Sequence, residues 1–297
     1  MFKLLLVALV LNTFIYAELV NYKIEPTSIN KKTKINILDS KELKFKNLDE
    51  ISALAMKENI LYALSDKGEL FTFKIKISKD KIKKLKLLES KKLKDKNSKK
   101  LSKKDSDSEG MIIVDNKLYI SFEKNHRIEV YSLDGKKIKK LQLNKKLNDK
   151  NNYKSENKGL EALAYNKKYA LVTAPEIPKK NKKYHTLYAK NKKWMFELSG
   201  DIKGLEFINN DELLLMQRDY NEKKSEMNII FNTINLSQCG GEKICKNNIL
   251  AKLKTKNGWR LYNFEGLTKV DKNRFLMVSD NHGEKSQKTL LVLFEIK

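Results

Sequence analysis

The sequence predicts an all-β protein that folds as a single β-propeller with blades of four strands. The main observation is a phrase that recurs five times: a small or acidic residue, a few apolar residues, a polar turn, and an apolar strand ending in an acid. Its copies span residues 49–66, 108–123, 159–176, 204–219 and 264–280. A period of roughly 40–60 residues built from short strands is typical of propeller blades. Only three prolines occur in 297 residues, so no proline-rich linker divides the chain.

Each repeat supplies one hairpin, and a second hairpin completes a blade. In the second repeat, residues 130–143 contain an Asp-Gly dipeptide that is typical of a tight hairpin turn. Residues 227–236 together with the closing strands are candidates for one more blade, so we expect five to six blades and favour six. Strands at residues 19–24 and 289–296, from the two ends of the chain, are expected to meet in one blade and close the ring.

Three lysine-rich segments are expected to be surface excursions between strands: residues 75–104, 144–158 and 178–193. The first begins as an alternating strand and ends as a charged loop. A helix over residues 80–94 is the alternative, although it lacks a good N-cap. His185 lies in the third segment without an evident partner, so we expect it to be exposed.

The first 17 residues have the pattern of a secretory signal peptide. One lysine precedes an apolar run at residues 4–11, and Ala17 is a small residue at the expected cleavage site. The run is too short to span a membrane, although an uncleaved N-terminal anchor is the alternative. We therefore expect residues 18–297 to form a periplasmic or secreted propeller domain, monomeric and without stable membrane insertion.

The two cysteines, Cys239 and Cys245, lie close together in the segment CGGEKIC. In an exported chain, a single close pair favours a disulfide that closes a small loop. A zinc site would need two more ligands nearby, and none is visible in the sequence. We therefore expect a disulfide.

The formal net charge is +25, which raises the question of nucleic-acid binding. Only four of the 62 basic residues are arginine, and proteins that read bases and phosphates rely on the arginine fork. Lysine is abundant in strands and loops alike, which favours a composition bias with solvated surfaces. We expect no nucleic-acid partner; attraction to polyanions such as anionic headgroups or phosphorylated small molecules is the alternative.

Acidic side chains recur at two positions of the repeat, and both are expected at one rim of the ring. The leading positions are Ser52, Glu109, Glu161, Glu206 and Glu265, and the closing acids are Asp66, Glu123, Glu176, Asp219 and Asp280. Carboxylates that lie this close raise one another's pKa unless a cation intervenes. A calcium ion, which takes about six to eight oxygen ligands, is one candidate for relieving this repulsion. Lysine or arginine partners are another, and capping of strand-end N–H groups within each blade is the alternative without a ligand.

Basic and imidazole groups accompany these acids. His126 and Arg127 follow the closing acid of the second repeat, Arg218 precedes that of the fourth, and His282 follows that of the fifth. Such a mixture suits the binding of a phosphate or carboxylate ester beside a cation, with ion pairs between neighbouring blades as the alternative. The sequence has no G-x-S-x-G elbow, P-loop, G-x-G-x-x-G, H-E-x-x-H or C-x-x-C motif.

Several segments together resemble the bacterial phytase-like domain family, described as having "esterase-like activity of phytase". They are DSEGMIIVDNKLYISFEKNHRIEVY, NKGLEALAYNKKYALVTAPE, LLLMQRDY and NFEGLTKVDKNRFLMVSDN followed by KTLLVLFEI. The resemblance covers residues 49–297 and implies a propeller fold, export to the periplasm, and hydrolysis of phosphoesters or esters with calcium as a candidate cofactor. One departure is the SAL at residues 52–54, where the family has an SGL-type turn.

The resulting hypothesis is a metal-assisted hydrolase of phosphate or carboxylic esters that acts on a small anionic ester or phosphoester. In it, Glu109, Glu161, Glu265 and Asp280 hold a cation such as calcium. Arg127 and Arg218 bind the substrate anion, and His126 or His282 assists proton transfer. The alternative is a non-catalytic periplasmic binding or scaffold propeller.

Overall fold

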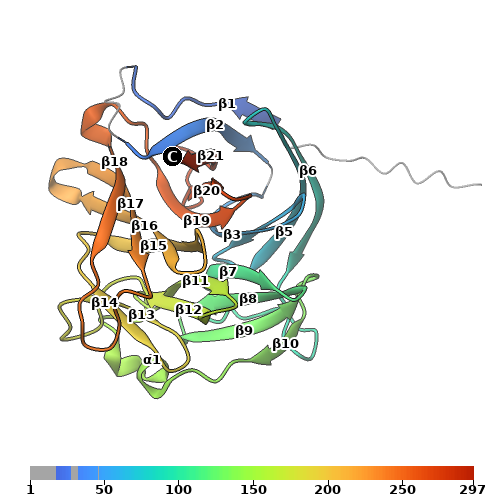
Figure 1. The fold of residues 1–297 in the computed structure, drawn as a ribbon. Coiled ribbons are helices and arrows are strands. Elements are labelled where there is room, and N and C mark those ends of the chain that lie inside the picture. The colour runs from blue at the N-terminus through green and yellow to red at the C-terminus, as the bar shows by residue number, and fades with distance from the viewer. Residues whose placement is uncertain (1–17, 28–32, 46) are drawn as a thin grey trace, which may run out of the picture.

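The computed structural model describes residues 18–27, 33–45 and 47–297, which form five β-sheets around a central axis (Figure 1). The expected signal peptide, residues 1–17, lies outside the described residues. In the part of the chain that is described, no helix is long and apolar enough to span a membrane. The predicted all-β propeller is confirmed.

Four of the blades consist of four consecutive strands, with the first strand of each lying innermost. Blade 1 contains β3 (Ile51–Lys57), β4 (Ile60–Ser65), β5 (Glu69–Ser78) and β6 (Lys81–Lys92); blade 2 contains β7 (Ser108–Val114), β8 (Lys117–Phe122), β9 (Arg127–Ser132) and β10 (Lys137–Lys140). Blade 3 contains β11 (Leu160–Asn166), β12 (Ala170–Pro175), β13 (His185–Tyr188) and β14 (Lys193–Phe196); blade 4 contains β15 (Asp201–Phe207), β16 (Glu212–Asn221), β17 (Glu226–Asn235) and β18 (Asn247–Lys254). Each innermost strand contacts the innermost strand of the next blade, so the five strands surround a narrow channel.

Blade 5 joins the two ends of the chain. Its strands, from the channel outwards, are β19 (Asn263–Lys269), β20 (Arg274–Asp280), β21 (Leu290–Ile296), β2 (Ile35–Lys44) and β1 (Glu18–Asn21). The two ends do share a sheet, but β1 pairs with β2, and it is β2 that pairs with β21. The strand β2 was not predicted because polar residues interrupt the alternation of its apolar residues. One of these polar residues, Asp39, is buried and accepts a hydrogen bond of 2.8 Å from the backbone N–H of Ile82.

The favoured count of six blades is wrong for the residues that the structure describes, which contain five sheets. Of residues 227–236, the candidate for a sixth blade, all but the last belong to β17, which pairs along its whole length with β16. The long step between the last two repeats is filled by β17, β18 and the loop that joins them. The predicted disulfide between Cys239 and Cys245 is confirmed, and it closes this loop.

Two of the three expected surface excursions contain strands instead. The helix considered for residues 80–94 is replaced by β6, on which Ile82 and Leu85 are buried. Residues 178–193 include β13, and His185 at its start is buried rather than exposed. Only residues 144–158 form an excursion as expected, with the short helices α1 (Lys145–Asn148) and η1 (Lys150–Asn152). Two further single turns, η2 (Glu222–Lys224) and η3 (Thr255–Asn257), connect strands in blade 4 and after it.

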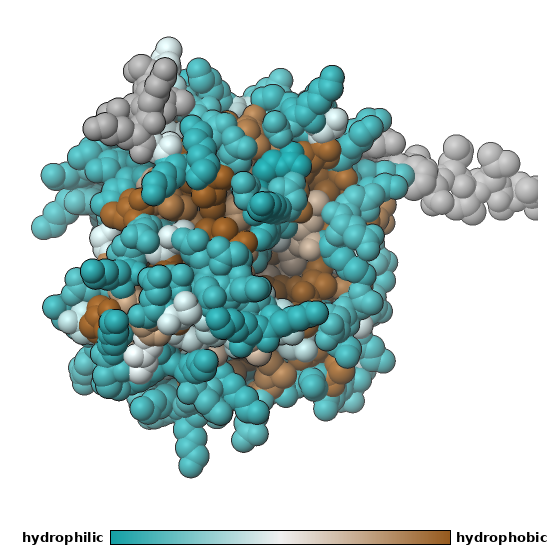
Figure 2. Space-filling view, in the orientation of Figure 1, coloured by the Kyte–Doolittle hydropathy of each residue, from teal (hydrophilic) through white to brown (hydrophobic). Residues whose placement is uncertain are grey.

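Apolar side chains between neighbouring blades form the core. Each of the five hydrophobic clusters takes its members from two adjacent blades. Between blades 4 and 5, for example, the rings of Phe231 and Phe294 lie 5.0 Å apart, and both are fully buried. Aromatic pairs of this kind add about 0.5–1.5 kcal/mol beyond the burial of their area. Figure 2 shows the same arrangement from outside, with hydrophilic side chains over most of the face and hydrophobic ones in its recesses.

Candidate functional site

Every innermost strand contains a β-bulge at the same place, where two of its residues face one residue of the second strand. The additional residues are Ser52, Glu109, Glu161, Lys203 and Glu265. A bulge redirects the side chain of the additional residue, and all five line the centre of the ring. The cavity between them has a volume of about 10 Å³, which is close to the minimum for one water molecule.

The residue after each bulge is glycine or alanine because the next innermost strand passes very close to it. A Cβ atom on Gly110 would lie 2.7 Å from the carbonyl oxygen of Glu161. On Gly266 it would lie 2.6 Å from a methyl group of Val278 and 3.0 Å from the backbone of Ala53. The small residue therefore allows the strands to close around the bulged side chains.

The structure corrects the alignment of the fourth repeat, where Lys203 and not Glu206 occupies the bulge. Glu206 accepts hydrogen bonds of 3.0 and 3.1 Å from the backbone N–H groups of Phe207 and Lys269, and burial raises its pKa to about 7. The segment Lys203-Gly204-Leu205 matches the Glu-Gly-Leu of the fifth repeat. A recurring acid does not identify this position, because its charge is reversed in the fourth repeat.

The closing position of the repeat shows the same reversal. The residues opposite the start of each innermost strand are Asp66, Glu123, Glu176, Arg218 and Asp280. Arg218 pairs in register with Asp201 and is thus the counterpart of the other closing acids, one residue before the predicted Asp219. Blade 4 therefore contributes two cations where the other blades contribute acids or serine. We call the region formed by the five bulged residues, the five closing residues and the side chains that contact them the channel mouth.

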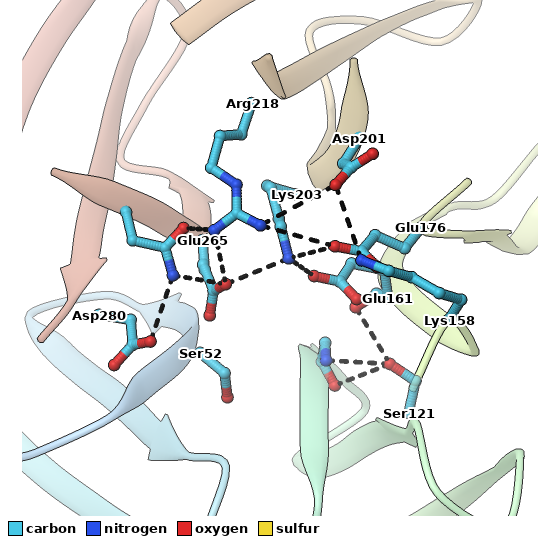
Figure 3. A network of polar contacts seen from close by, with 12 residues as sticks. Ser52, Ser121, Lys158, Glu161, Glu176, Asp201, Lys203, Arg218, Glu265 and Asp280 are labelled. Carbon is cyan, nitrogen blue, oxygen red and sulfur yellow. Dashed lines mark hydrogen bonds and ion pairs between the residues drawn. The ribbon is translucent and has the colours of Figure 1, made fainter. Parts of the chain in front are cut away.

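Lys203 is the centre of the polar network at the channel mouth (Figure 3). Its ammonium nitrogen lies 2.5 Å from Glu161, 2.8 Å from Glu176 and 3.1 Å from Glu265, and its side chain is 5% exposed. Burial alone would lower the pKa of Lys203, but these three carboxylates raise it well above its usual value. Burial would likewise raise the pKa of Glu176, but Lys203 and Lys158 lower it below its usual value.

Arg218 lies above this network with longer contacts. Its guanidinium group is 3.9 Å from Glu176 and Asp201 and 4.0 Å from Glu265. It also donates a hydrogen bond to the side-chain oxygen of Asn263. With its side chain 20% exposed, Arg218 keeps access to solvent at the channel mouth.

Acids cluster in blades 2 and 3 of the channel mouth, where Lys203 contacts Glu161 and Glu176, and Lys124 lies 2.9 Å from Asp107. Carboxylate oxygens of Asp107, Glu109 and Glu123 lie within 4.8 Å of one another, as do those of Glu123, Glu161 and Glu176. Burial, and then repulsion by Glu161 and Glu265, raises the pKa of Glu109 well above its usual value. Burial, with repulsion by Glu176 and Asp107, raises the pKa of Glu123 to about 7. Either acidic group could bind a metal ion, because clustered carboxylate oxygens are the ligands of hard divalent cations.

His282 and Asp280 form a dyad at the edge of the channel mouth. The Nδ1 atom of His282 lies 2.7 Å from Asp280, whose carboxylate also accepts hydrogen bonds from the His282 backbone N–H (2.7 Å) and from Asn263 (3.2 Å). The hydrogen bond that His282 donates to Asp280 raises the pKa of His282 above its usual value. The imidazole is 52% exposed, so its other nitrogen is accessible to solvent.

The structure brings six of the predicted site residues to the channel mouth: Glu109, Glu161, Glu265, Asp280, Arg218 and His282. It holds the other two, His126 and Arg127, inside the protein. The Nε atom of Arg127 lies 2.9 Å from Glu129, and its guanidinium group stacks 3.8 Å from the ring centre of Phe122.

The two other histidines are buried. His126 packs 3.8 Å from the ring of Tyr153, and burial lowers its pKa. His185 stacks on Phe196 between strands of blade 3, and burial lowers its pKa to about 4. Sequence spacing alone did not distinguish these buried imidazoles from the exposed one on His282.

A family model described as "Phytase-like: Esterase-like activity of phytase" matches residues 46–283. No curated protein matches the sequence. Among solved structures, the PQQ-bound aldose sugar dehydrogenase from Streptomyces coelicolor is similar, with a TM-score of 0.48 and 10% identity over 89% of this chain and 98% of that one. The RRP9 WD40 repeats are similar with a TM-score of 0.46 and 8% identity, over 88% of this chain and 97% of that one.

The role of Lys203 can be tested by replacing it with a side chain of similar length and no charge. Lys203→Met leaves three buried carboxylates without their cation, and we expect the free energy of unfolding at neutral pH to fall by about 3–5 kcal/mol. Urea denaturation measures this change. The matched control is Lys168→Met, which breaks the exposed pair with Asp211 and is expected to cost at most about 1 kcal/mol. Equal losses in the two variants would contradict the role assigned to Lys203.

The closing acid of blade 1 makes stability depend on pH. Burial, with repulsion by Asp280 and Asp107, raises the pKa of Asp66 to about 7, whereas an aspartate in the unfolded chain has a pKa of about 3.9. Between these values the folded state binds more protons than the unfolded state, so this group destabilises the protein as pH rises through the window. We expect Asp66→Asn to lose less thermal stability than the parent between pH 4.5 and 7.5 in metal-free buffer. A steeper loss in the variant would show that the sign is wrong.

Proposed function

Because the chain belongs to the phytase-like family, we propose that it hydrolyses phosphate or carboxylic esters with the help of a divalent cation bound at the channel mouth. The observation that carries the proposal is the cluster of Asp107, Glu109 and Glu123, whose oxygens lie within 4.8 Å of one another. Three carboxylates this close repel one another. A bound cation would relieve that repulsion and create a positively charged point beside the channel.

Calcium is the proposed cation, since it prefers oxygen ligands and tolerates irregular geometry. Of the residues predicted to hold a metal, Glu109 and Glu161 belong to the two acidic groups of the channel mouth. Glu265 is engaged by Lys203 and accepts a hydrogen bond from Asn263, and Asp280 is engaged by His282. Lys203 also contacts Glu161 and Glu176, at 2.5 and 2.8 Å. We therefore assign the cation to Asp107, Glu109 and Glu123. When bound, the cation would polarise the ester oxygen that contacts it.

Basic side chains at the same end of the channel are the proposed contacts for the substrate anion. Arg218 retains donors, since its contacts with Glu176, Asp201 and Glu265 are 3.9–4.0 Å long. Lys124 and Lys158 have side chains that are 35% and 33% exposed and contact acids of the channel mouth. A guanidinium group with two ammonium groups suits a phosphate or a carboxylate. Arg127 is left out because Glu129 and Phe122 already engage it.

Proton transfer is assigned to His282. Asp280 accepts a hydrogen bond at Nδ1 and so fixes the ring, which leaves Nε2 as the atom that accepts a proton from an attacking water molecule. The exposed position of the ring permits contact with a substrate outside the narrow channel. His126 is not assigned a role in the reaction, since it packs on Tyr153 in the interior.

We further propose that the protein acts outside the cytoplasm, as a monomer, on small anionic esters rather than on nucleic acid or membranes. The disulfide between Cys239 and Cys245 supports this, because disulfides persist in oxidising compartments. An acidic channel mouth also disfavours a polyanion such as nucleic acid at this site.

A binding or scaffold propeller without catalysis is the second candidate, and the narrow channel favours it. The bulged residues leave only about 10 Å³ between them, and Lys203 occupies the axis with ion pairs. A propeller whose centre is closed in this way can serve as a rigid platform without converting a ligand. The experiment below distinguishes the two candidates.

Glu123 belongs to both acidic groups, so it is the residue to replace. We expect the purified protein to hydrolyse members of a panel of phosphomonoesters and short acyl esters only when calcium is present. Glu123→Gln is expected to lower kcat/KM by at least about 100-fold, since it removes a ligand of the cation. The matched control is Glu89→Gln on an exposed strand edge. If no substrate in the panel is hydrolysed with calcium, the scaffold function is the correct one.

The pH dependence of hydrolysis tests the dyad. With a neutral imidazole as the base, the rate should rise as pH increases through the raised pKa of His282. His282→Gln is expected to lower kcat by about 10²–10⁴-fold and to remove this limb of the profile. Asp280→Asn removes the carboxylate that raises the pKa of His282, so this limb of the profile should move to lower pH. A variant of His282 that keeps the full rate and the same profile would rule out its role.

A further inference from the structure

A second recess lies in blade 3 at the strand ends opposite the channel mouth. It has a volume of about 810 Å³ and includes Tyr169, beside the turn between β11 and β12, and the turn between β13 and β14. The register places both turns away from Glu176, because β12 begins at Ala170 beside the first turn and ends at Pro175 next to Glu176. The recess is therefore separate from the acidic residues described above.

The recess is strongly basic. Its lining includes Lys146, Lys168, Lys190, Lys192 and Lys193, and no aspartate or glutamate. Two of these lysines are paired with acids next to the recess: Lys168 lies 2.7 Å from Asp211, and Lys193 lies 2.5 Å from Glu242. In the part of the chain that is described, the other three form no ion pair with an acid. Three ammonium groups that share one concavity repel one another, and an anion between them would relieve this repulsion.

Aromatic walls strengthen this electrostatic effect. Tyr169, Tyr188 and Trp194 line the recess, and the ammonium groups of Lys168 and Lys192 lie 5.5 and 5.4 Å from the ring centre of Tyr169. Apolar walls reduce the local dielectric constant, so charges interact more strongly than at an open surface.

The loop closed by the disulfide forms another wall of the recess, and several bonds hold this loop in place. Gly241 donates a backbone hydrogen bond of 3.2 Å to Lys193, and Cys245 donates one of 2.7 Å to Met195. The bond between Cys239 and Cys245 restricts the loop further. Little ordering is then required when a ligand binds, which favours affinity.

We propose that this recess binds a small molecule that carries two or more clustered negative charges, of which a pyrophosphate group is the simplest form. Lysines bind phosphate as point charges, and the volume lies within the range of about 300–1,000 Å³ that is usual for small-molecule sites. The net charge of +25 raised the alternative that the protein attracts polyanions, and this recess is where we place that attraction. It does not rest on the hydrolase function.

The probe is inorganic pyrophosphate, titrated calorimetrically into the full chain in metal-free buffer at physiological ionic strength. We expect saturable binding of one pyrophosphate per chain. The double variant Lys190→Gln/Lys192→Gln should weaken binding by at least about tenfold, because it removes two of the three unpaired charges. The matched control is Lys96→Gln/Lys99→Gln, which removes the same charge from an exposed loop outside the recess and should change affinity by less than about twofold.

Two further titrations test where the anion binds and which kind of anion it is. Arg218→Gln reports on anion binding at the channel mouth instead of in the recess. Tighter binding of ADP than of pyrophosphate would support a nucleotide ligand that also contacts Tyr188, and equal binding would support free pyrophosphate. The proposal is overturned if binding does not saturate, if both double variants lose affinity equally, or if only Arg218→Gln weakens binding.

Discussion

The buried ammonium group of Lys203 is the interaction on which the centre of this propeller depends. Five bulged strands bring their side chains to one axis, and three of these side chains are glutamates. A buried carboxylate that lacks a partner is costly, and several together are more so. Lys203 contacts Glu161, Glu176 and Glu265 at once, so the exchange of an acid for a base in one blade lets the ring close around its acids.

The same interaction divides the channel mouth into two parts. Acids near blade 4 are neutralised by Lys203, Arg218 and Lys158. On the other side, Asp107 contacts Lys124, and Glu109 and Glu123 form no ion pair in the part of the chain that is described. The proposed calcium site follows from this division. The charge of the molecule is divided as well: a chain with a net charge of +25 has acids at one end of its channel and an acid-free, lysine-lined recess at the opposite strand ends of blade 3.

The fold was largely predictable because hydrophobic alternation and tight turns recur in every repeat, and these are local properties of the sequence. The strand β2 was not predicted because it contains polar residues such as Asp39. The burial of Asp39 depends on a hydrogen bond to a distant strand, which the sequence does not reveal. Lys203 was not predicted for a different reason. The repeats were aligned by their acidic residues, whereas the backbone bulge selects a position in the strand whatever the charge of its side chain. The burial of Arg127 and His185 depends on contacts with distant strands, which spacing along one repeat does not indicate.

The proposed calcium site consists of acids that do not contact Lys203. Calcium titration of the purified protein by isothermal calorimetry tests it most directly, with Glu109→Gln as the variant. We expect at least one bound calcium ion per chain and an affinity that falls by at least about tenfold in the variant, since even residues that only support a metal ligand contribute about 10–100-fold. Absence of calcium binding to the parent protein, or an unchanged affinity in Glu109→Gln, would contradict it.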